Sequence, residues 1–326
     1  MREAEHYTRE NGKLRCALCP HRCLIAEGKK GLCGVRENRG GKLYALTYGK
    51  VAAVAVDPVE KKPLYHFYPG RDILSVGSVG CNFSCLFCQN WHLVEGLTPL
   101  RDVTPEELLD VSRRRGSIGI SYTYNEPLIQ WEFVRDCARV FREAGQVNVL
   151  VTNGFVNEGP LRELLPLVDA MNIDLKFFRE ETYRKISRGS LEPVKKTIQV
   201  ASQSCLVEVT TLVVTGLNDT EEEIRAIVDF IASVDPSIPY HISRYFPHYK
   251  YDAPPTDEGF LLRAYEIARE KLEFVYLGNV LIPGTDDTRC PSCGELLISR
   301  RGYSVKINSL KGDRCGSCGR RLNIVV

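Results

Sequence analysis

The sequence lacks any long apolar segment and any excess of one charge. No stretch approaches about 18 consecutive apolar residues, the length at which a membrane-spanning helix becomes a candidate. The N-terminus, MREAEHYTRE, carries charges of both signs and no apolar core, which excludes the pattern of a secretory signal. With 43 basic and 41 acidic residues, the overall charge gives no support to nucleic acid or an anionic membrane as main partner. We therefore expect a soluble, unexported, cytoplasmic protein.

Low-complexity segments are also lacking, as is the composition of a disordered chain. The 326 residues are 44% apolar, which is ordinary for a globular protein and enough for one large α/β domain with small attachments. The only repetition along the chain is a series of strand and helix patterns. We therefore expect a folded, multipart protein.

Cysteine, in contrast, is abundant. The 13 cysteines follow tight C-x-x-C spacings without a secretory signal, so they favour metal binding over disulfides. They form three groups, which are Cys16, Cys19, Cys23 and Cys33, then Cys81, Cys85 and Cys88, and finally Cys290, Cys293, Cys315 and Cys318. Cys137 and Cys205 stand apart, and we interpret both as small buried apolar residues.

Six short apolar runs alternate with helical patterns in the middle of the chain. The runs span 73–80, 117–124, 146–153, 170–178, 205–214 and 239–246. Most are apolar on consecutive residues, which is typical of strands buried on both faces of a parallel sheet. Thr104 with Glu107 predicts a capped helix start, and Thr220 with Glu223 repeats that capping box. The series predicts an α/β fold, an open partial (β/α)6 barrel, with its chemistry where strands end.

The composition changes on both sides of this barrel. Residues 1–72 contain the first cysteine group and the apolar stretch KVAAVAV, and we interpret them as an N-terminal cysteine-rich metal-binding domain. The barrel itself is assigned to 73–287, which includes a helical stretch at 257–272 and a further strand, EFVYLGNV. Residues 288–326 form short β-like pieces between two cysteine pairs and are predicted to be a zinc ribbon.

The stretch GCNFSCLFCQNW places three cysteines directly after the first predicted strand of the barrel. Cys81, Cys85 and Cys88 would hold a four-iron cluster through three of its irons and leave the fourth open to an outside ligand. The alternative is a zinc site with a distant fourth ligand such as His92. The preceding strand and the five further strand–helix units favour the cluster.

The C-x-x-x-C-x-x-C spacing at this position resembles the signature of radical S-adenosylmethionine (SAM) enzymes. In that superfamily the amino and carboxylate groups of SAM chelate the open iron. The resemblance implies catalytic Cys81, Cys85 and Cys88, and it places Phe87 near the SAM adenine.

Further stretches at strand ends resemble SAM-binding motifs. TYNEP brings Asn125 and Glu126 to the position of the Gly-Gly-Glu-Pro stretch that holds the SAM ammonium, although Asn125 alone could also cap a helix. TNG and DLK resemble motifs that contact SAM in pyruvate formate-lyase activating enzymes. That similarity implies cofactor contacts for Thr152, Asn153, Asp174 and Lys176.

Other interpretations remain open at the later strands. Asp174 and Lys176 lie two residues apart on one face of a strand, so a mutual ion pair is the alternative to ligand contact. His241 and Arg244 are weaker candidates for cofactor binding, and a buried, hydrogen-bonded histidine is the alternative for the first.

The two terminal cysteine groups each supply four ligands. CPSCG and CGSCG are two knuckles that indicate a zinc ribbon, with a rubredoxin-type iron site as the alternative. The N-terminal group, CALCPHRC followed by GLCGVRE, fits either zinc or a second iron–sulfur cluster. Zinc is slightly favoured there, with His21 as a spare ligand.

Nearly the whole chain resembles the radical SAM enzymes of the AmmeMemoRadiSam system, named for co-occurring Memo-family and AMMECR-family proteins. The matching stretches are CALCPHRC, GLCGVRE, YHFYPG, GCNFSCLFCQNW, TYNEP, VTNG, DLK, TTLVVTGLND, HISRYFPHYK, VYLGN and the terminal cysteine pairs. Two features depart from expectation. Val151 stands where the activating enzymes carry a cation-binding aspartate, and LIPGTDD contains an unexpected proline.

The resemblance implies an enzyme that reductively cleaves SAM to a 5'-deoxyadenosyl radical, which abstracts hydrogen from an unidentified substrate. A protein or peptide substrate is favoured, with a Memo-family or AMMECR-family protein as the candidate partner and ferredoxin or flavodoxin as the candidate electron donor. The alternatives are a small-molecule or nucleotide substrate, and a noncatalytic metal-binding or electron-transfer module. Cleavage of SAM toward an aminocarboxypropyl fragment would use the same cysteines.

Overall fold

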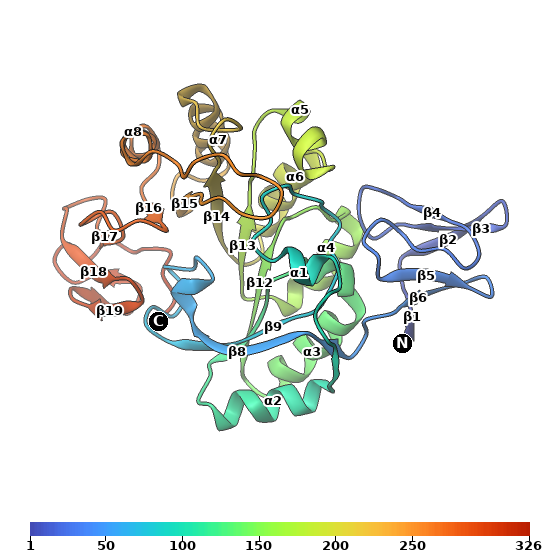
Figure 1. Ribbon diagram of the computed structural model, residues 1–326. Coiled ribbons are helices and arrows are strands. Elements are labelled where there is room, and N and C mark those ends of the chain that lie inside the picture. Colours follow the sequence, from blue (N-terminus) through green and yellow to red (C-terminus); the bar gives the residue numbers. More distant parts are fainter.

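The computed structural model describes residues 1–326, and its centre is one mostly parallel sheet (Figure 1). The eight strands have the order β16-β15-β14-β13-β12-β11-β9-β8. Their bounds are β8 (Ala53–Pro58), β9 (Asp72–Gly77), β11 (Gly119–Tyr122), β12 (Val147–Thr152), β13 (Ala170–Asp174), β14 (Leu206–Val213), β15 (Tyr240–Arg244) and β16 (Val275–Gly278). Neighbours from β9 to β16 pair in parallel, which confirms the α/β class and the parallel sheet.

The sheet is larger than the six predicted strands. β16 pairs in parallel with β15, so the stretch EFVYLGNV adds a seventh parallel strand. β8 comes from the segment assigned to the N-terminal domain, yet it pairs antiparallel with β9 along its whole length. β16 and β8 are the two outermost strands, and they form hydrogen bonds to the backbone of β15 and β9. A local sequence pattern does not show which strand such a segment will pair with.

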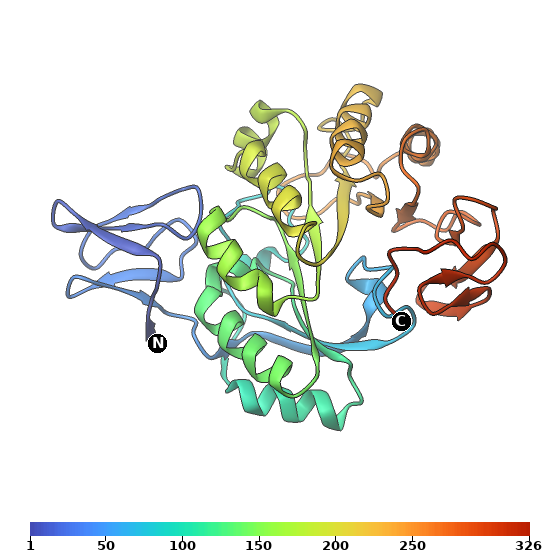
Figure 2. The same ribbon diagram turned by 180° about the vertical axis from the view of Figure 1, so that it is seen from behind.

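Helices follow most of the parallel strands and pack on one face of the sheet (Figure 2). Their bounds are α2 (Pro105–Arg114), α3 (Trp131–Glu143), α4 (Glu158–Leu164), α6 (Leu191–Ala201), α7 (Glu221–Val234) and α8 (Glu258–Arg269), with shorter turns at α1 (Trp91–Val94) and α5 (Glu180–Thr182). The capping box of Thr104 and Glu107 is present at α2. At α7, Thr220 accepts from the Glu223 amide, but the Glu223 carboxylate accepts from the Phe178 and Arg179 amides. The second predicted box is therefore only half formed.

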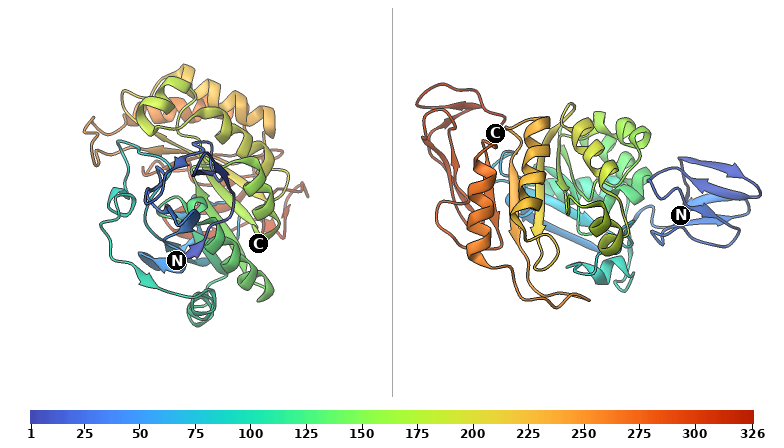
Figure 3. Two further views of the ribbon diagram at one scale, coloured as in Figure 1. Left: turned by 90° about the vertical axis from the view of Figure 1, so that its right-hand side faces the viewer. Right: turned by 90° about the horizontal axis from the view of Figure 1, so that it is seen from above.

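Two small cysteine-rich parts lie at opposite ends of the molecule (Figures 1 and 3). The N-terminal part contains two three-stranded sheets, formed by β1 (Arg2–Glu3), β5 (Arg36–Arg39) and β6 (Lys42–Ala45), and by β2 (Tyr7–Glu10), β3 (Lys13–Cys16) and β4 (Leu24–Ile25). The C-terminal part contains β17 (Thr288–Arg289), β18 (Leu296–Arg301) and β19 (Ser304–Ile307), with a hairpin of β20 (Leu310–Lys311) and β21 (Arg314–Cys315). The short strands β7 (Lys50–Val51) and β10 (Arg101–Asp102) pair antiparallel with each other.

The parallel strands are almost fully buried, which agrees with their unbroken apolar patterns. The carboxyl ends of these strands all lie on one side of the sheet. Thr152 and Asp174 are the last residues of β12 and β13, and the loops that follow the strands carry the cysteine motif, Asn125, Glu126, Asn153 and Lys176. None of the helices combines the length and the apolar character that crossing a bilayer requires.

Candidate functional site

The loop after β9 carries the three-cysteine motif, and Asn125 fixes its backbone. Asn125 Oδ1 accepts a hydrogen bond from the Ser78 amide at 2.9 Å, and its Nδ2 donates to the Gly80 carbonyl at 3.0 Å. Gly80 has a φ of +84°, in the left-handed region that favours glycine. Asn125 thus positions the loop with its side-chain amide, and Glu126 instead of Asn125 caps the following helical turn.

The three thiols of this loop are largely buried, and two of them have hydrogen-bond partners. Burial raises the pKa of Cys81 and Cys85, and it raises the pKa of Cys88 to about 11. The Phe83 amide donates to Cys81 Sγ at 3.3 Å, and Cys85 Sγ lies 3.3 Å from Ser187 Oγ. Hydrogen bonds to ligating sulfurs are a feature of iron–sulfur sites, so this donor set fits a cluster.

Glu126 links the ends of two neighbouring strands beside these thiols. Its side chain is buried, and its carboxylate accepts from Thr152 Oγ1 at 2.7 Å and from the Asn153 amide at 2.8 Å. Burial raises the pKa of Glu126 to about 7 despite these hydrogen bonds. Asn153 Nδ2 in turn lies 3.7 Å from Cys81 Sγ. The TYNEP and TNG stretches therefore meet at the loop that carries Cys81, Cys85 and Cys88, which we call the cluster loop.

Asp174 and Lys176 form an ion pair with each other at 2.8 Å, which is the alternative that the sequence left open. Burial opposes the charge of Lys176, but Asp174 and the Cys85 thiolate outweigh it and raise the pKa of the amine. Asp174 is one-third exposed in its side chain, so its carboxylate remains accessible from the strand ends. Both groups lie within electrostatic reach of Cys85.

Three other predicted cofactor residues have different surroundings. Phe87 is buried against Phe177, with ring centroids 6.0 Å apart. His241 is buried with its Nε2 2.6 Å from Glu208, as expected for a satisfied core histidine. Arg244 donates to the Thr256 carbonyl at 2.9 Å and pairs with Glu258. His241 and Arg244 thus have protein partners away from the cluster loop, and their cofactor contacts stay predictions.

Several residues around the loop were missed by sequence reasoning. Asn82 donates to the Phe155 carbonyl at 2.8 Å and accepts from Asn153 at the same distance, although it lies inside the motif itself. Ser187 belongs to no recognisable pattern. Gly189 approaches Phe83 so closely that an added Cβ would lie 2.2 Å from its ring, and only the glycine itself signals this contact.

Three aromatic residues near the strand ends, Trp91, Tyr122 and Tyr124, make different contacts. Trp91 stacks on Tyr249 with ring centroids 5.3 Å apart. Tyr122 is buried and donates to Asn148, so it serves packing. Tyr124 donates to Asp57 at 2.6 Å. The chain around Tyr249 also contacts the cluster loop, since the Lys250 amide donates to the Leu86 carbonyl at 3.0 Å.

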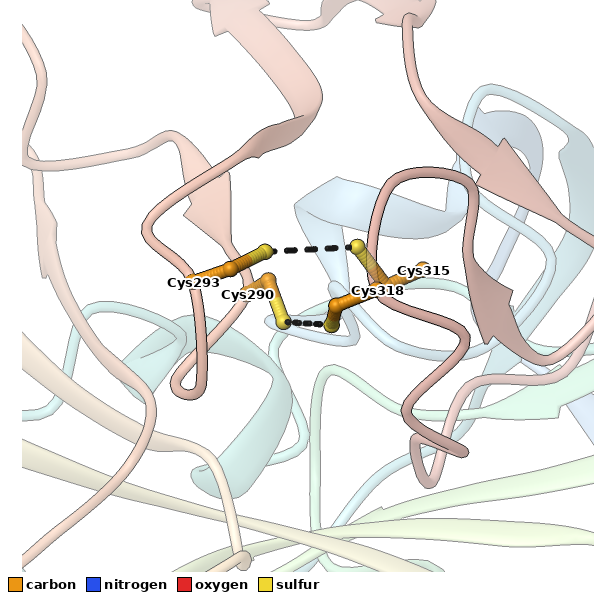
Figure 4. A group of neighbouring side chains, drawn as sticks. All are labelled: Cys290, Cys293, Cys315 and Cys318. Carbon is orange, nitrogen blue, oxygen red and sulfur yellow. Dashed lines mark hydrogen bonds between the residues drawn. The ribbon is translucent and has the colours of Figure 1, made fainter.

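A separate cysteine site lies in the C-terminal part (Figure 4). Cys290 and Cys318 have sulfurs 3.6 Å apart, and those of Cys293 and Cys315 are 3.7 Å apart. All four sulfurs lie within 4.8 Å of one another. Four thiolates at about 2.3 Å from one tetrahedral zinc ion would be about 3.8 Å apart, so the geometry is that of a single-ion site.

The N-terminal cysteines also gather in space, but more loosely. The Cys16 amide donates to the Cys23 carbonyl at 3.0 Å, and the charges of Cys16, Cys33 and Cys23 all act on Cys19. His21 is not a spare ligand through its Nε2, because that atom donates to the Asn82 carbonyl at 2.7 Å.

Comparison with known proteins agrees with this arrangement. The model of the radical SAM superfamily matches residues 75–231. Uncharacterized protein MJ0808 of Methanocaldococcus jannaschii is 43% identical over 336 aligned positions, which cover 100% of both chains. The pyruvate formate-lyase 1-activating enzyme of Escherichia coli K12 is 28% identical over 182 residues, or 50% of this chain and 71% of the relative.

A solved structure shows the same fold. The radical SAM methyltransferase from Sphaerobacter thermophilus superimposes with a TM-score of 0.51 at 15% identity, covering 65% of this chain and 67% of that one. Radical SAM proteins use a four-iron cluster with SAM, and the thiols of Cys81, Cys85 and Cys88 fit that group. The chain is an enzyme of the radical SAM superfamily, and it belongs to one full-length family with the Methanocaldococcus protein.

Proposed function

We propose that this enzyme belongs to the AmmeMemoRadiSam system and acts on a protein or peptide, cleaving SAM to a 5'-deoxyadenosyl radical that takes hydrogen from the substrate. The observation that carries the substrate class is the similarity to pyruvate formate-lyase activating enzymes across half of the chain, because those relatives are named for action on a protein. A Memo-family or AMMECR-family protein is the proposed partner. Ferredoxin or flavodoxin is the proposed electron donor.

Cys81, Cys85 and Cys88 would hold the cluster, which supplies the electron for SAM cleavage when bound. Glu126 offers a buried carboxylate for an ammonium group. A ligand ammonium would lower its pKa from about 7, because a nearby cation favours the charged form of the acid. Asp174 can accept from ligand hydroxyl or amine groups while Lys176 balances its charge.

Aromatic residues around the cluster loop also keep solvent away from a reactive radical. Phe87 of the motif is buried against Phe177, and Trp91 at the end of the motif stacks on Tyr249. A shielded site matters because side reactions compete with the intended hydrogen transfer.

The cofactors of the terminal parts are also proposals. For the C-terminal part we propose zinc, supported by four sulfurs with single-ion spacing. Its exposed Cys293 and Cys318 stand at the surface, whereas Cys290 and Cys315 are buried against the small core of this part.

The first experiment is an anaerobic assay with protein reconstituted with iron and sulfide. SAM and dithionite are added, and 5'-deoxyadenosine is quantified beside Cys85→Ala and the matched variant Cys205→Ala, whose thiol lies outside all three groups. Product from the wild type and from Cys205→Ala, with none from Cys85→Ala, supports the proposal. An intact cluster with an aminocarboxypropyl product would overturn the bond assignment.

A second experiment tests the substrate class. Purified Memo-family and AMMECR-family proteins are added separately, and a pool of nucleotides and metabolites is added in parallel. Acceleration of 5'-deoxyadenosine formation by a protein, with deuterium transferred from that protein into the product, supports the proposal. Acceleration by the small-molecule pool alone would refute a protein substrate.

A further inference from the structure

The N-terminal cysteines differ from the C-terminal ones in the spacing of their sulfurs. Only Cys290, Cys293, Cys315 and Cys318 form a group of three or more candidate ligands whose atoms all lie within 4.8 Å. Neither the N-terminal four nor the three cysteines of the cluster loop meet that spacing. Thiolates of a four-iron cluster bind different irons, so they stand farther apart than thiolates that share one ion. In this respect the N-terminal group resembles the cluster loop.

The N-terminal four are nevertheless one group. Burial is the main cause that raises the pKa of Cys19 to about 12, and the charges of Cys16, Cys33 and Cys23 add to it. Cys16 and Cys33 also lie near the guanidinium of Arg36. That side chain is 1% exposed and paired with Glu132 at 2.7 Å. The buried Arg36–Glu132 ion pair therefore lies beside two of the four thiols.

The four N-terminal cysteines lie directly against the cluster loop. A Cβ added to Gly80 would lie 2.5 Å from the carbonyl oxygen of Cys33, and Gly80 immediately precedes Cys81. On the other side of that cysteine, the Asn82 carbonyl accepts from His21 at 2.7 Å. The backbone on both sides of Cys81 therefore contacts the N-terminal cysteine loops.

We propose that Cys16, Cys19, Cys23 and Cys33 bind a second four-iron cluster, which passes single electrons to the cluster held by Cys81, Cys85 and Cys88. Four protein thiolates complete its coordination, so no iron is left for SAM or substrate, and electron transfer is the chemistry that remains. The balance is one electron from a reduced one-electron carrier to the second cluster, from there to the first, and from the first to SAM. Only this last step rests on the proposed function.

The exposed residues beside Cys33 suit a small acidic carrier. Leu32, which adjoins Cys33, is 70% exposed, and the neighbouring Lys29 and Lys30 are exposed as well. An exposed apolar residue beside cations is complementary to an acidic partner, and charge complementarity speeds encounter.

The first test is composition, and it does not depend on SAM cleavage. The full chain carrying Cys81→Ala, Cys85→Ala and Cys88→Ala is reconstituted with iron and sulfide, and its metals are counted. We expect about four iron ions per chain, a dithionite-reducible cluster signal in electron paramagnetic resonance, and about one zinc from the C-terminal site. Wild type should hold about twice that iron. A triple variant with two zinc ions and no iron would overturn the proposal, as would wild type with iron for a single cluster.

The second test is electron transfer. Photoreduced bacterial ferredoxin or dithionite is mixed with wild type, with Cys19→Ala/Cys33→Ala and with Cys205→Ala, and reduction of the first cluster is followed by freeze-quench paramagnetic resonance. We expect the double variant to be reduced about tenfold more slowly by ferredoxin and at an unchanged rate by dithionite. Equal rates with ferredoxin in all three proteins would refute the relay. Because this readout needs no SAM cleavage, it separates failure of the relay from failure of the proposed function.

Discussion

The buried ion pair between Arg36 and Glu132 gives the sharpest stability prediction, because it joins the N-terminal domain to helix α3. Arg36 Nη2 donates to both carboxylate oxygens, at 2.9 and 2.7 Å, and the Glu5 amide donates to the same carboxylate at 2.7 Å. The two side chains are 1% and 0% exposed. Removing the negative charge leaves a guanidinium buried without its partner, which costs about 3–5 kcal/mol.

The perturbation is Glu132→Gln, which keeps the shape and one oxygen acceptor. Amide hydrogen exchange in β5 and β6 measures the local opening of the N-terminal domain. A loss of about 3–5 kcal/mol corresponds to exchange about two to four orders of magnitude faster, while amides in the distant strand β18 should be unaffected.

A double-mutant cycle separates the pair from the sum of its parts. Arg36→Met/Glu132→Leu removes both charges together, so it should destabilise the domain less than either Arg36→Met or Glu132→Leu alone. Additive losses in the double variant would refute the reasoning, because they would mean that the two charges do not interact. Unchanged exchange in Glu132→Gln would show that the pair does not hold the domain.

Three further predictions concern the contacts of the two terminal parts. Burial lowers the pKa of His66 to about 4, so the neutral imidazole contributes fully to folding stability above pH 6.5. About 3 kcal/mol of that stability should be lost as the pH falls from 6.5 toward 4, because the unfolded chain binds the proton first. The difference in melting temperature between wild type and His66→Asn should narrow over that range, and a constant difference would contradict the prediction. Gly80→Ala should lower the free energy of unfolding by at least about 1–2 kcal/mol because of the left-handed φ, and the clash with the Cys33 carbonyl adds to that loss. Gly96 has a similar φ but lies in open space, so chemical denaturation should show a smaller loss for Gly96→Ala. Zinc removal, or Cys293→Ser, should speed proteolysis within residues 288–326 while leaving the iron content unchanged, and equal loss of both metals would contradict separate sites.

The parallel strands were predictable because burial on both faces produces unbroken apolar runs. The edges of the sheet were not. β16 has the same apolar character as the other strands, but its place depends on pairing with β15, such as Tyr240 opposite Val275. The run that became β8 could have closed a small N-terminal sheet, and only the free edge of β9 decided otherwise.

The candidate site was predictable where adjacent residues share one function and unpredictable where distant residues satisfy each other. The cysteine motif, TYNEP and TNG do meet, since each stands at the carboxyl end of one of three neighbouring parallel strands. His241 instead pairs with Glu208 on the neighbouring strand, and no local pattern announces that partner. Ser187 reaches Cys85 from far along the chain.

The sequence by itself determined the parallel sheet, the three groups of cysteines and the superfamily, because apolar runs, ligand spacing and short motifs are local properties of the chain. The tertiary structure alone decided how far apart the sulfurs of each group stand, and it placed Cys33 against Gly80 beside Cys81. Those distances depend on backbones that are remote in sequence. They give the C-terminal sulfurs single-ion spacing and bring the N-terminal cysteines against the loop of Cys81, because packing fixes these distances and spacing along the chain does not.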